Sequence, residues 1–147
     1  MSAREYQFSL VMPEHLEFFW PVVCGWIEAA LERAAVDTPG LDVVAERVKG
    51  GRYLLLLGAD AGQVEVAGVL ERVNAKSKTY LGIIALGGRT GRALRGIGPE
   101  YWQVVRNIAK AEGMAGVRVV GRPGWLRWCA AQPGGAKLKQ VLIEAGV

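Results

Sequence analysis

The stretch from Leu86 to Val120, LGGRTGRALRGIGPEYWQVVRNIAKAEGMAGVRVV, decides the fold. It runs from a strand through a glycine- and arginine-rich loop, Gly87 to Gly98, into an amphipathic helix from Pro99 to Glu112. Gly113 is a typical helix C-terminal stop, and Gly116 to Gly121 has the composition of a following strand. A strand–helix–strand step of this kind usually makes a parallel, right-handed connection. The stretch therefore predicts a β-α-β crossover.

Three apolar segments separated by short turns precede this crossover and predict an antiparallel meander. They are Arg52 to Gly58, Gln63 to Val73 and Thr79 to Leu86. Further upstream, apolar residues at three- and four-residue spacing after Pro13 predict a helix that is kinked or split at Pro21. Leu41 to Val48 predicts a second, shorter helix, and a short strand is expected around Tyr6 to Val11.

Two further elements are expected after the crossover, a short helix at Trp125 to Ala131 and a last helix or strand at Ala136 to Gly146. Residues 131–147 are a candidate C-terminal extension. The order of elements predicts an α/β (α+β) fold for residues 1–147, as one domain with a central, mostly antiparallel sheet flanked by helices.

Composition excludes several classes of protein. The chain has 147 residues, of which 51% are hydrophobic and 22% charged, so it is long and apolar enough to bury a core. No apolar run approaches the ~20 residues that span a bilayer. The N-terminus lacks the charged, then apolar, then small-residue segments of a signal peptide. Cys24 and Cys129 are the only cysteines and His15 is the only histidine, so we expect no metal site and a reducing compartment, the cytoplasm.

Charge is distributed unevenly along the chain. Residues 1–71 hold 11 acidic and 5 basic side chains, whereas residues 72–147 hold 3 acidic and 13 basic ones. A basic half favours an anionic partner, such as a phosphorylated cofactor, a nucleic acid or an acidic protein surface. The alternative is that the two halves pack together and balance each other.

The loop from Gly87 to Gly98 combines features that suit a pyrophosphate. Glycines let backbone N–H groups approach a ligand closely, and the following helix N-terminus offers unpaired donors and a positive dipole end. Arg89, Arg92 and Arg95 add positive charge. The alternative is a plain helix start with Gly98 as N-cap, and a helical Gly88 to Arg95 would instead carry a basic stripe on one face.

The same segment resembles the GNAT acyltransferase superfamily, which is marked by a strand, Arg/Gln-x-x-Gly-x-Gly/Ala, a helix and a strand. Gly96 and Gly98 match the two small positions, while Ala93 stands where Arg or Gln is expected, with Arg92 beside it. The resemblance implies binding of acetyl-CoA. The backbone N–H groups of Gly96, Ile97 and Gly98 would hold the pyrophosphate, assisted by Arg92 or Arg95.

A narrower resemblance is to small GNAT-like proteins encoded by tailed bacteriophages. It rests on Leu86-Gly87-Gly88 after the meander, on a tryptophan-containing early helix, and on Gly121-Arg122-Pro123-Gly124-Trp125 after the last predicted strand. This resemblance implies a location in the host cytoplasm or the virion. Virion or assembly proteins, or a second copy of the chain, would be its partners.

The chain also departs from the superfamily at the positions expected to carry catalysis. The strand Thr79 to Leu86 has no acid, and no tyrosine follows Val120. Glu71, or less favourably Glu65, is the candidate base one strand earlier. The sequence thus favours acyl-CoA binding over efficient transfer of an acetyl group to an amine. Two alternatives stay open, a catalytically degenerate virion structural or assembly protein and a nucleic-acid-binding module.

Overall fold

The computed structural model describes residues 6–33, 38–119 and 131 of the chain. Several predictions concern residues outside this range. They are the Gly121 to Trp125 motif, the final element at Ala136 to Gly146, the thiol of Cys129, and, apart from Ala131, the short helix from Trp125 and the C-terminal extension.

A five-stranded sheet in the order β1-β2-β3-β4-β5 forms the centre of the molecule. Neighbouring strands from β1 to β4 are antiparallel, and β5 pairs with β4 in parallel. This arrangement confirms the predicted meander and crossover. The strands are β1 (Tyr6–Leu10), β2 (Tyr53–Asp60), β3 (Gln63–Ala75), β4 (Lys78–Gly88) and β5 (Gly116–Val119).

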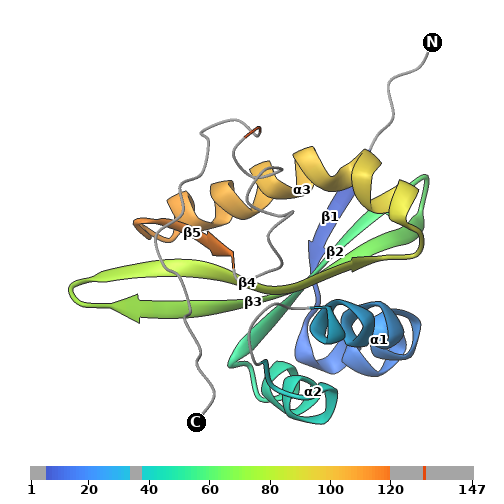
Figure 1. Cartoon of the computed structure of the whole chain (residues 1–147), viewed down its shortest axis with the longest axis horizontal. Coiled ribbons are helices and arrows are strands. Elements are labelled where there is room, and N and C mark those ends of the chain that lie inside the picture. Colours follow the sequence, from blue (N-terminus) through green and yellow to red (C-terminus); the bar gives the residue numbers. More distant parts are fainter. Residues whose placement is uncertain (1–5, 34–37, 120–130, 132–147) are drawn as a thin grey trace, which may run out of the picture.

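Helices cover both faces of the sheet. In Figure 1, α1 and α2 lie below the sheet and α3 lies above it. Of the two expectations at Pro21, the split into two helices is wrong, because α1 continues through this residue as one helix. A short 3-10 helix, η1, comes before α1. The bounds are η1 (Pro13–His15), α1 (Leu16–Glu32), α2 (Leu41–Lys49) and α3 (Gly91–Ala111).

Alternation along the strands builds two separate core layers. On the face covered by α1 and α2, side chains such as Leu55, Val69 and Ile27 are almost fully buried. On the opposite face, Leu56, Leu70 and residues of α3 form the second layer. The sheet therefore has two covered faces, with β1 and β5 at its described edges.

The glycine- and arginine-rich segment differs from its prediction as a loop up to Gly98. Helix α3 begins at Gly91, and Pro99 lies inside it. Leu94, Ile97 and Tyr101 recur on one face and pack in the second core layer. Their burial outweighs the cost of about 1 kcal/mol that each helical glycine carries. The C-terminal end is as predicted, since Gly113 follows the helix with a φ of +71°.

Two β-bulges interrupt the regular pairing of the sheet. Gly58 lies opposite Val66 and Ala59 opposite Val64, so Glu65 is the extra residue in β3. In β4, Ile84 is the extra residue, because Ala85 and Ile83 lie opposite the consecutive residues Val69 and Leu70. Bulges redirect side chains and often lie next to functional sites. Both of these lie near the part of β4 that leads into α3.

Candidate cofactor-binding site

The turn from β4 into α3 is a capped helix N-terminus. Thr90 has an extended backbone, and its hydroxyl oxygen accepts a hydrogen bond from the N–H of Ala93 at 2.9 Å. Its carbonyl accepts the first helical bond, from the N–H of Leu94 at 3.1 Å. The N–H groups of Gly91 and Arg92 come before Leu94, the first residue whose N–H donates within the helix, so they point out of the helix end. This end is therefore a place where an anion can bind.

Two of the predicted cofactor residues lie at this helix end. Arg92 and Arg95 are exposed and lie within the first two turns of α3. A guanidinium nitrogen of Arg95 lies 3.6 Å from the position that a Cβ on Gly91 would take. The side chain of Arg95 therefore reaches back to the helix end and adds positive charge there.

The other three predicted cofactor residues lie elsewhere. Gly96, Ile97 and Gly98 are inside α3, more than one turn past its N-terminus. Backbone N–H groups at such positions bond to carbonyls one turn earlier, so they do not face a ligand. Ile97 is 1% exposed and packs in the core. The expectation that these three residues form a phosphate loop does not fit this geometry.

Arg89 is held by an ion pair with Glu65. Its Nε and one terminal nitrogen donate to the two carboxylate oxygens of Glu65 at 2.9 and 3.1 Å. The Glu65 side chain is only 12% exposed, against 48% for Arg89. The hydrogen bond and the negative charge of Glu65 raise the pKa of the Arg89 guanidinium. Glu65, the less favoured candidate base, is therefore already bound to Arg89.

Strand β4 continues beyond its pairing with β5. The parallel pairs run from Tyr80 opposite Gly116 to Ile83 opposite Val119. The bulge at Ile84 follows immediately, and β4 extends to Gly88. Within the described part of the chain, no strand pairs with the β5 side of Ile84–Gly88. The backbone groups on this side of β4 therefore lie next to the turn that ends at the N-terminus of α3, since β4 ends at Gly88 and α3 begins at Gly91.

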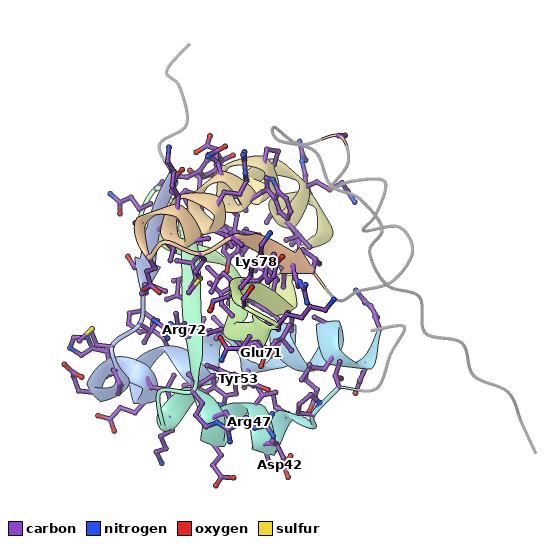
Figure 2. The ribbon with its side chains drawn as sticks, turned by 90° about the vertical axis from the view of Figure 1, so that its left-hand side faces the viewer. Asp42, Arg47, Tyr53, Glu71, Arg72 and Lys78 are labelled. Carbon is purple, nitrogen blue, oxygen red and sulfur yellow. The ribbon has the colours of Figure 1, made fainter. Side chains whose placement is uncertain are left out.

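Glu71, the favoured candidate base, lies on the face of the sheet that α1 and α2 cover. It is half-buried, opposite Tyr53 on β2 and Gly82 on β4. Arg47 of α2 donates to the Tyr53 hydroxyl at 2.5 Å. Figure 2 shows Glu71, Tyr53 and Arg47 following one another from the sheet toward α2. From Gly82 to Gly88, β4 spans about 20 Å at roughly 3.4 Å per residue, so Glu71 and the helix end are well separated.

Other features of the described residues lie away from this helix end. A groove of about 320 Å³ between β1 and the start of α1 has no lining residue from β4 or α3. Among the described residues, no cluster of His, Cys, Asp or Glu could hold a metal ion. None of the described helices has both the length and the apolar character needed to cross a membrane. Arg89 and Glu65 come from the basic and the acidic half of the chain, so the two halves balance each other at this point.

The sequence interpretation missed Thr90, Gly91 and Ala93. The signal was present, because the pattern x-x-x-Gly-x-Gly/Ala also fits Gly88 to Ala93. In that register Gly91 and Ala93 are the two small residues, and Gly88 stands where Arg or Gln is expected. Thr90 is a good N-cap residue just before the apolar positions Leu94 and Ile97.

Known structures share this fold at low sequence identity, whereas neither a known protein family nor a curated protein matches the sequence. A GCN5-related N-acetyltransferase from Ralstonia eutropha superposes with a TM-score of 0.69 and 16% identity, over 97% of this chain and 100% of the other. Aminoglycoside N-acetyltransferase AAC(6')-Iy in complex with CoA superposes with a TM-score of 0.69 and 11% identity, over 99% of this chain and 97% of the other. An aminoglycoside acetyltransferase from an uncultured soil metagenomic sample, in complex with sisomicin, superposes with a TM-score of 0.70 and 13% identity, over 97% of this chain and 96% of the other. The chain thus has the fold of the GNAT acetyltransferases.

Proposed function

We propose that this chain binds acyl-CoA and transfers the acyl group, acetyl in the simplest case, to an amine. The observation that carries the proposal is the capped N-terminus of α3. There the outward N–H groups of Gly91 and Arg92 combine with the charges of Arg92 and Arg95. A diphosphate needs donors and positive charge of this kind. The fold supports the same conclusion, since AAC(6')-Iy, which shares it, is in complex with CoA.

The β5 side of Ile84–Gly88, with which no described strand pairs, would take the rest of the cofactor. Bound CoA would supply the acyl group as a thioester at the end of its pantetheine arm. With the diphosphate at Gly91, the backbone groups on this side of Ile84–Gly88 would bind the amide groups of the arm in an extended form. The thioester would then lie toward Ile83 and Gly82, near the part of β4 that Glu71 faces.

Glu71 would accept the proton that the attacking amine loses. It is a half-buried carboxylate on β3, the strand that pairs with β4, and among the described residues no acid lies on β4 itself. General-base catalysis by a positioned carboxylate contributes typically about 10²–10⁴-fold. Glu71→Gln should therefore lower kcat by about 10²-fold or more and leave CoA affinity unchanged. An unchanged kcat would remove Glu71 from the mechanism.

Calorimetric titration of CoA and acetyl-CoA tests the binding site. We expect micromolar binding by the wild type, and a loss of at least about tenfold in Gly91→Glu, because a carboxylate at the helix end repels phosphate. Gly91→Gln is the matched control, since it adds a side chain of the same size without charge. Equal losses in both variants would point to steric disruption. No binding at millimolar CoA by folded wild type would refute the proposed function.

A structural or assembly role in a virion, through a homo-oligomer, is the second candidate. The supporting observation is a set of four exposed apolar side chains: Leu10 of β1 (43% exposed), Met12 just before η1 (54%), and Phe18 (68%) and Val22 (52%), which are four residues apart on α1. Large exposed apolar patches are typical of protein interfaces. Sedimentation would then give an oligomer that Phe18→Glu dissociates, whereas a monomer at all concentrations would contradict it.

No comparable observation favours nucleic-acid binding. Binding of that kind would be recognised by a steep loss of affinity with salt. The phage origin also stays a prediction, because none of the three structures compared above is described as a phage protein.

A further inference from the structure

We propose that Arg89 is a positioning residue that acts through Glu65. It neutralises this carboxylate beside the N-terminus of α3, and it makes no contact with the cofactor. The proposal rests on the proposed function, because it assigns a role at the same helix end. It distinguishes Arg89 from Arg92 and Arg95, which the sequence places in one basic group.

The bulge in β3 explains why a carboxylate lies at this place. Glu65 is the extra residue between Val64 and Val66, so it has no opposite residue on β2. Glu65 is also the only buried charged residue among those that the structure describes. A buried carboxylate is costly unless it is paired and hydrogen-bonded. Arg89 meets that requirement with two donors.

Arg89 is tied to Glu65 by its main chain as well as by its side chain. Its backbone N–H donates to the Glu65 carbonyl at 2.8 Å. The next residue is Thr90, whose hydroxyl caps α3. The main-chain bond involves no side chain, so it holds the turn in every charge variant. The side-chain pair adds the neutralisation of a carboxylate that lies beside the helix end.

The charges of the pair explain why Arg89 does not serve as a phosphate ligand. Both carboxylate oxygens of Glu65 accept from Arg89, so the guanidinium uses one edge entirely on this partner. Turning Arg89 toward a phosphate would leave the 12% exposed Glu65 carboxylate unpaired, close to a second anion. Arg92 and Arg95, which are exposed and on the helix itself, are the residues available to the ligand.

A double-mutant cycle tests the proposal with CoA titrated into the folded proteins. We expect Arg89→Gln to weaken CoA binding on the order of tenfold or more, because the unpaired carboxylate repels the phosphates. Glu65→Gln with Arg89→Gln should recover most of that loss, since neither charge remains. Glu65→Gln alone should stay within about threefold of wild type. Arg89→Lys, which keeps the charge, should also bind nearly as well as wild type.

Arg92→Gln is the matched control, since it removes one charge from the same helix end. Its loss of affinity should persist when Glu65→Gln is added. Three results would overturn the proposal. They are wild-type affinity in Arg89→Gln, equally weak binding in Arg89→Gln and the double variant, or losses of CoA affinity that parallel the decrease in Tm across all variants. The second result would make Arg89 a direct ligand. Absence of CoA binding by the wild type would instead refute the proposed function itself.

Discussion

The hydroxyl of Tyr101 fills the space that a side chain on Gly68 would need. Tyr101 lies on α3, is 1% exposed and donates to the Leu56 carbonyl at 2.9 Å. A Cβ built on Gly68 would overlap this hydroxyl oxygen. Strand β3 must therefore have a glycine directly under the tyrosine, so that α3 can approach the sheet closely enough to bury its apolar face.

Gly68→Ala should lower the free energy of unfolding by about 1–3 kcal/mol, the usual cost of forcing extra atoms into a packed core. Denaturant unfolding measures the change. Gly25→Ala is the matched control, because a Cβ on Gly25 of α1 meets no atom within 4 Å. We expect that substitution to stabilise the protein by up to about 1 kcal/mol, since alanine is the better helix former. Equal effects at the two glycines would contradict the close contact.

Alkaline pH should destabilise the wild type through Tyr101. Burial raises the pKa of Tyr101 well above its ordinary value of 10.0. The folded protein thus holds this proton more tightly than the unfolded chain does. The resulting stability is fully present below about pH 10 and is lost as the pH rises toward the folded-state pKa, with a slope of up to about 1.4 kcal/mol per pH unit.

Tyr101→Phe should remove this part of the pH dependence, at the expense of about 1 kcal/mol at neutral pH for the lost hydrogen bond. Unfolding curves measured between pH 8 and pH 11 compare the two proteins. Tyr80→Phe, which alters a half-buried tyrosine whose ring lies 4.0 Å from the Arg118 guanidinium carbon, is the control. A wild-type slope in Tyr101→Phe would show that other groups cause the alkaline loss.

Thr90→Ala should destabilise the protein by about 1 kcal/mol, because the N–H of Ala93 loses its capping acceptor. Thr90→Ser retains a hydroxyl oxygen and should lie within a few tenths of a kcal/mol of wild type. Thermal unfolding at equal protein concentration tests both variants. If alanine and serine behave alike, the hydroxyl does not cap α3 in solution.

The two arginine–glutamate pairs should differ in their contribution to stability. Arg72 and Glu112 meet at 3.2 Å, but their side chains are 48% and 41% exposed. Exposed pairs contribute about 0–1 kcal/mol, so Glu112→Gln should change the free energy of unfolding by less than about 1 kcal/mol. Glu65→Ala, which removes the buried partner of Arg89, should lower the free energy of unfolding by more than Glu112→Gln does. The reverse order would mean that burial of the carboxylate does not decide the strength of the pair.

The strands were predictable from sequence because apolar segments of strand length are separated by short turn segments. Residues Gln63 to Val73 and Thr79 to Leu86, for example, fall within β3 and β4. The start of α3 is hidden in the sequence because Gly96 and Gly98 favour a loop, although the apolar spacing of Leu94, Ile97 and Tyr101 continues through them. Burial of that stripe, which depends on the sheet beneath it, decides the helix.

The candidate site was predictable only in part, for a similar reason. The arginines could be identified as a group, but their roles depend on which of them meets a carboxylate from another strand. Glu65 lies 24 residues before Arg89, and a bulge brings the two together. A bulge is a property of the pairing between two strands, so no local pattern in either strand reveals it.

The bulge at Ile84 also changes the phase of β4. Before it, the odd-numbered residues Leu81 and Ile83 pack toward α3, whereas beyond it the odd-numbered Ala85 packs toward α1 and the even-numbered Leu86 toward α3. One inserted residue thus reverses which residues of β4, odd-numbered or even-numbered, face each core layer. A relative without this insertion would need a one-residue gap here to be aligned correctly, and without the gap every buried residue from Ala85 to Gly88 would be assigned to the wrong side of the sheet.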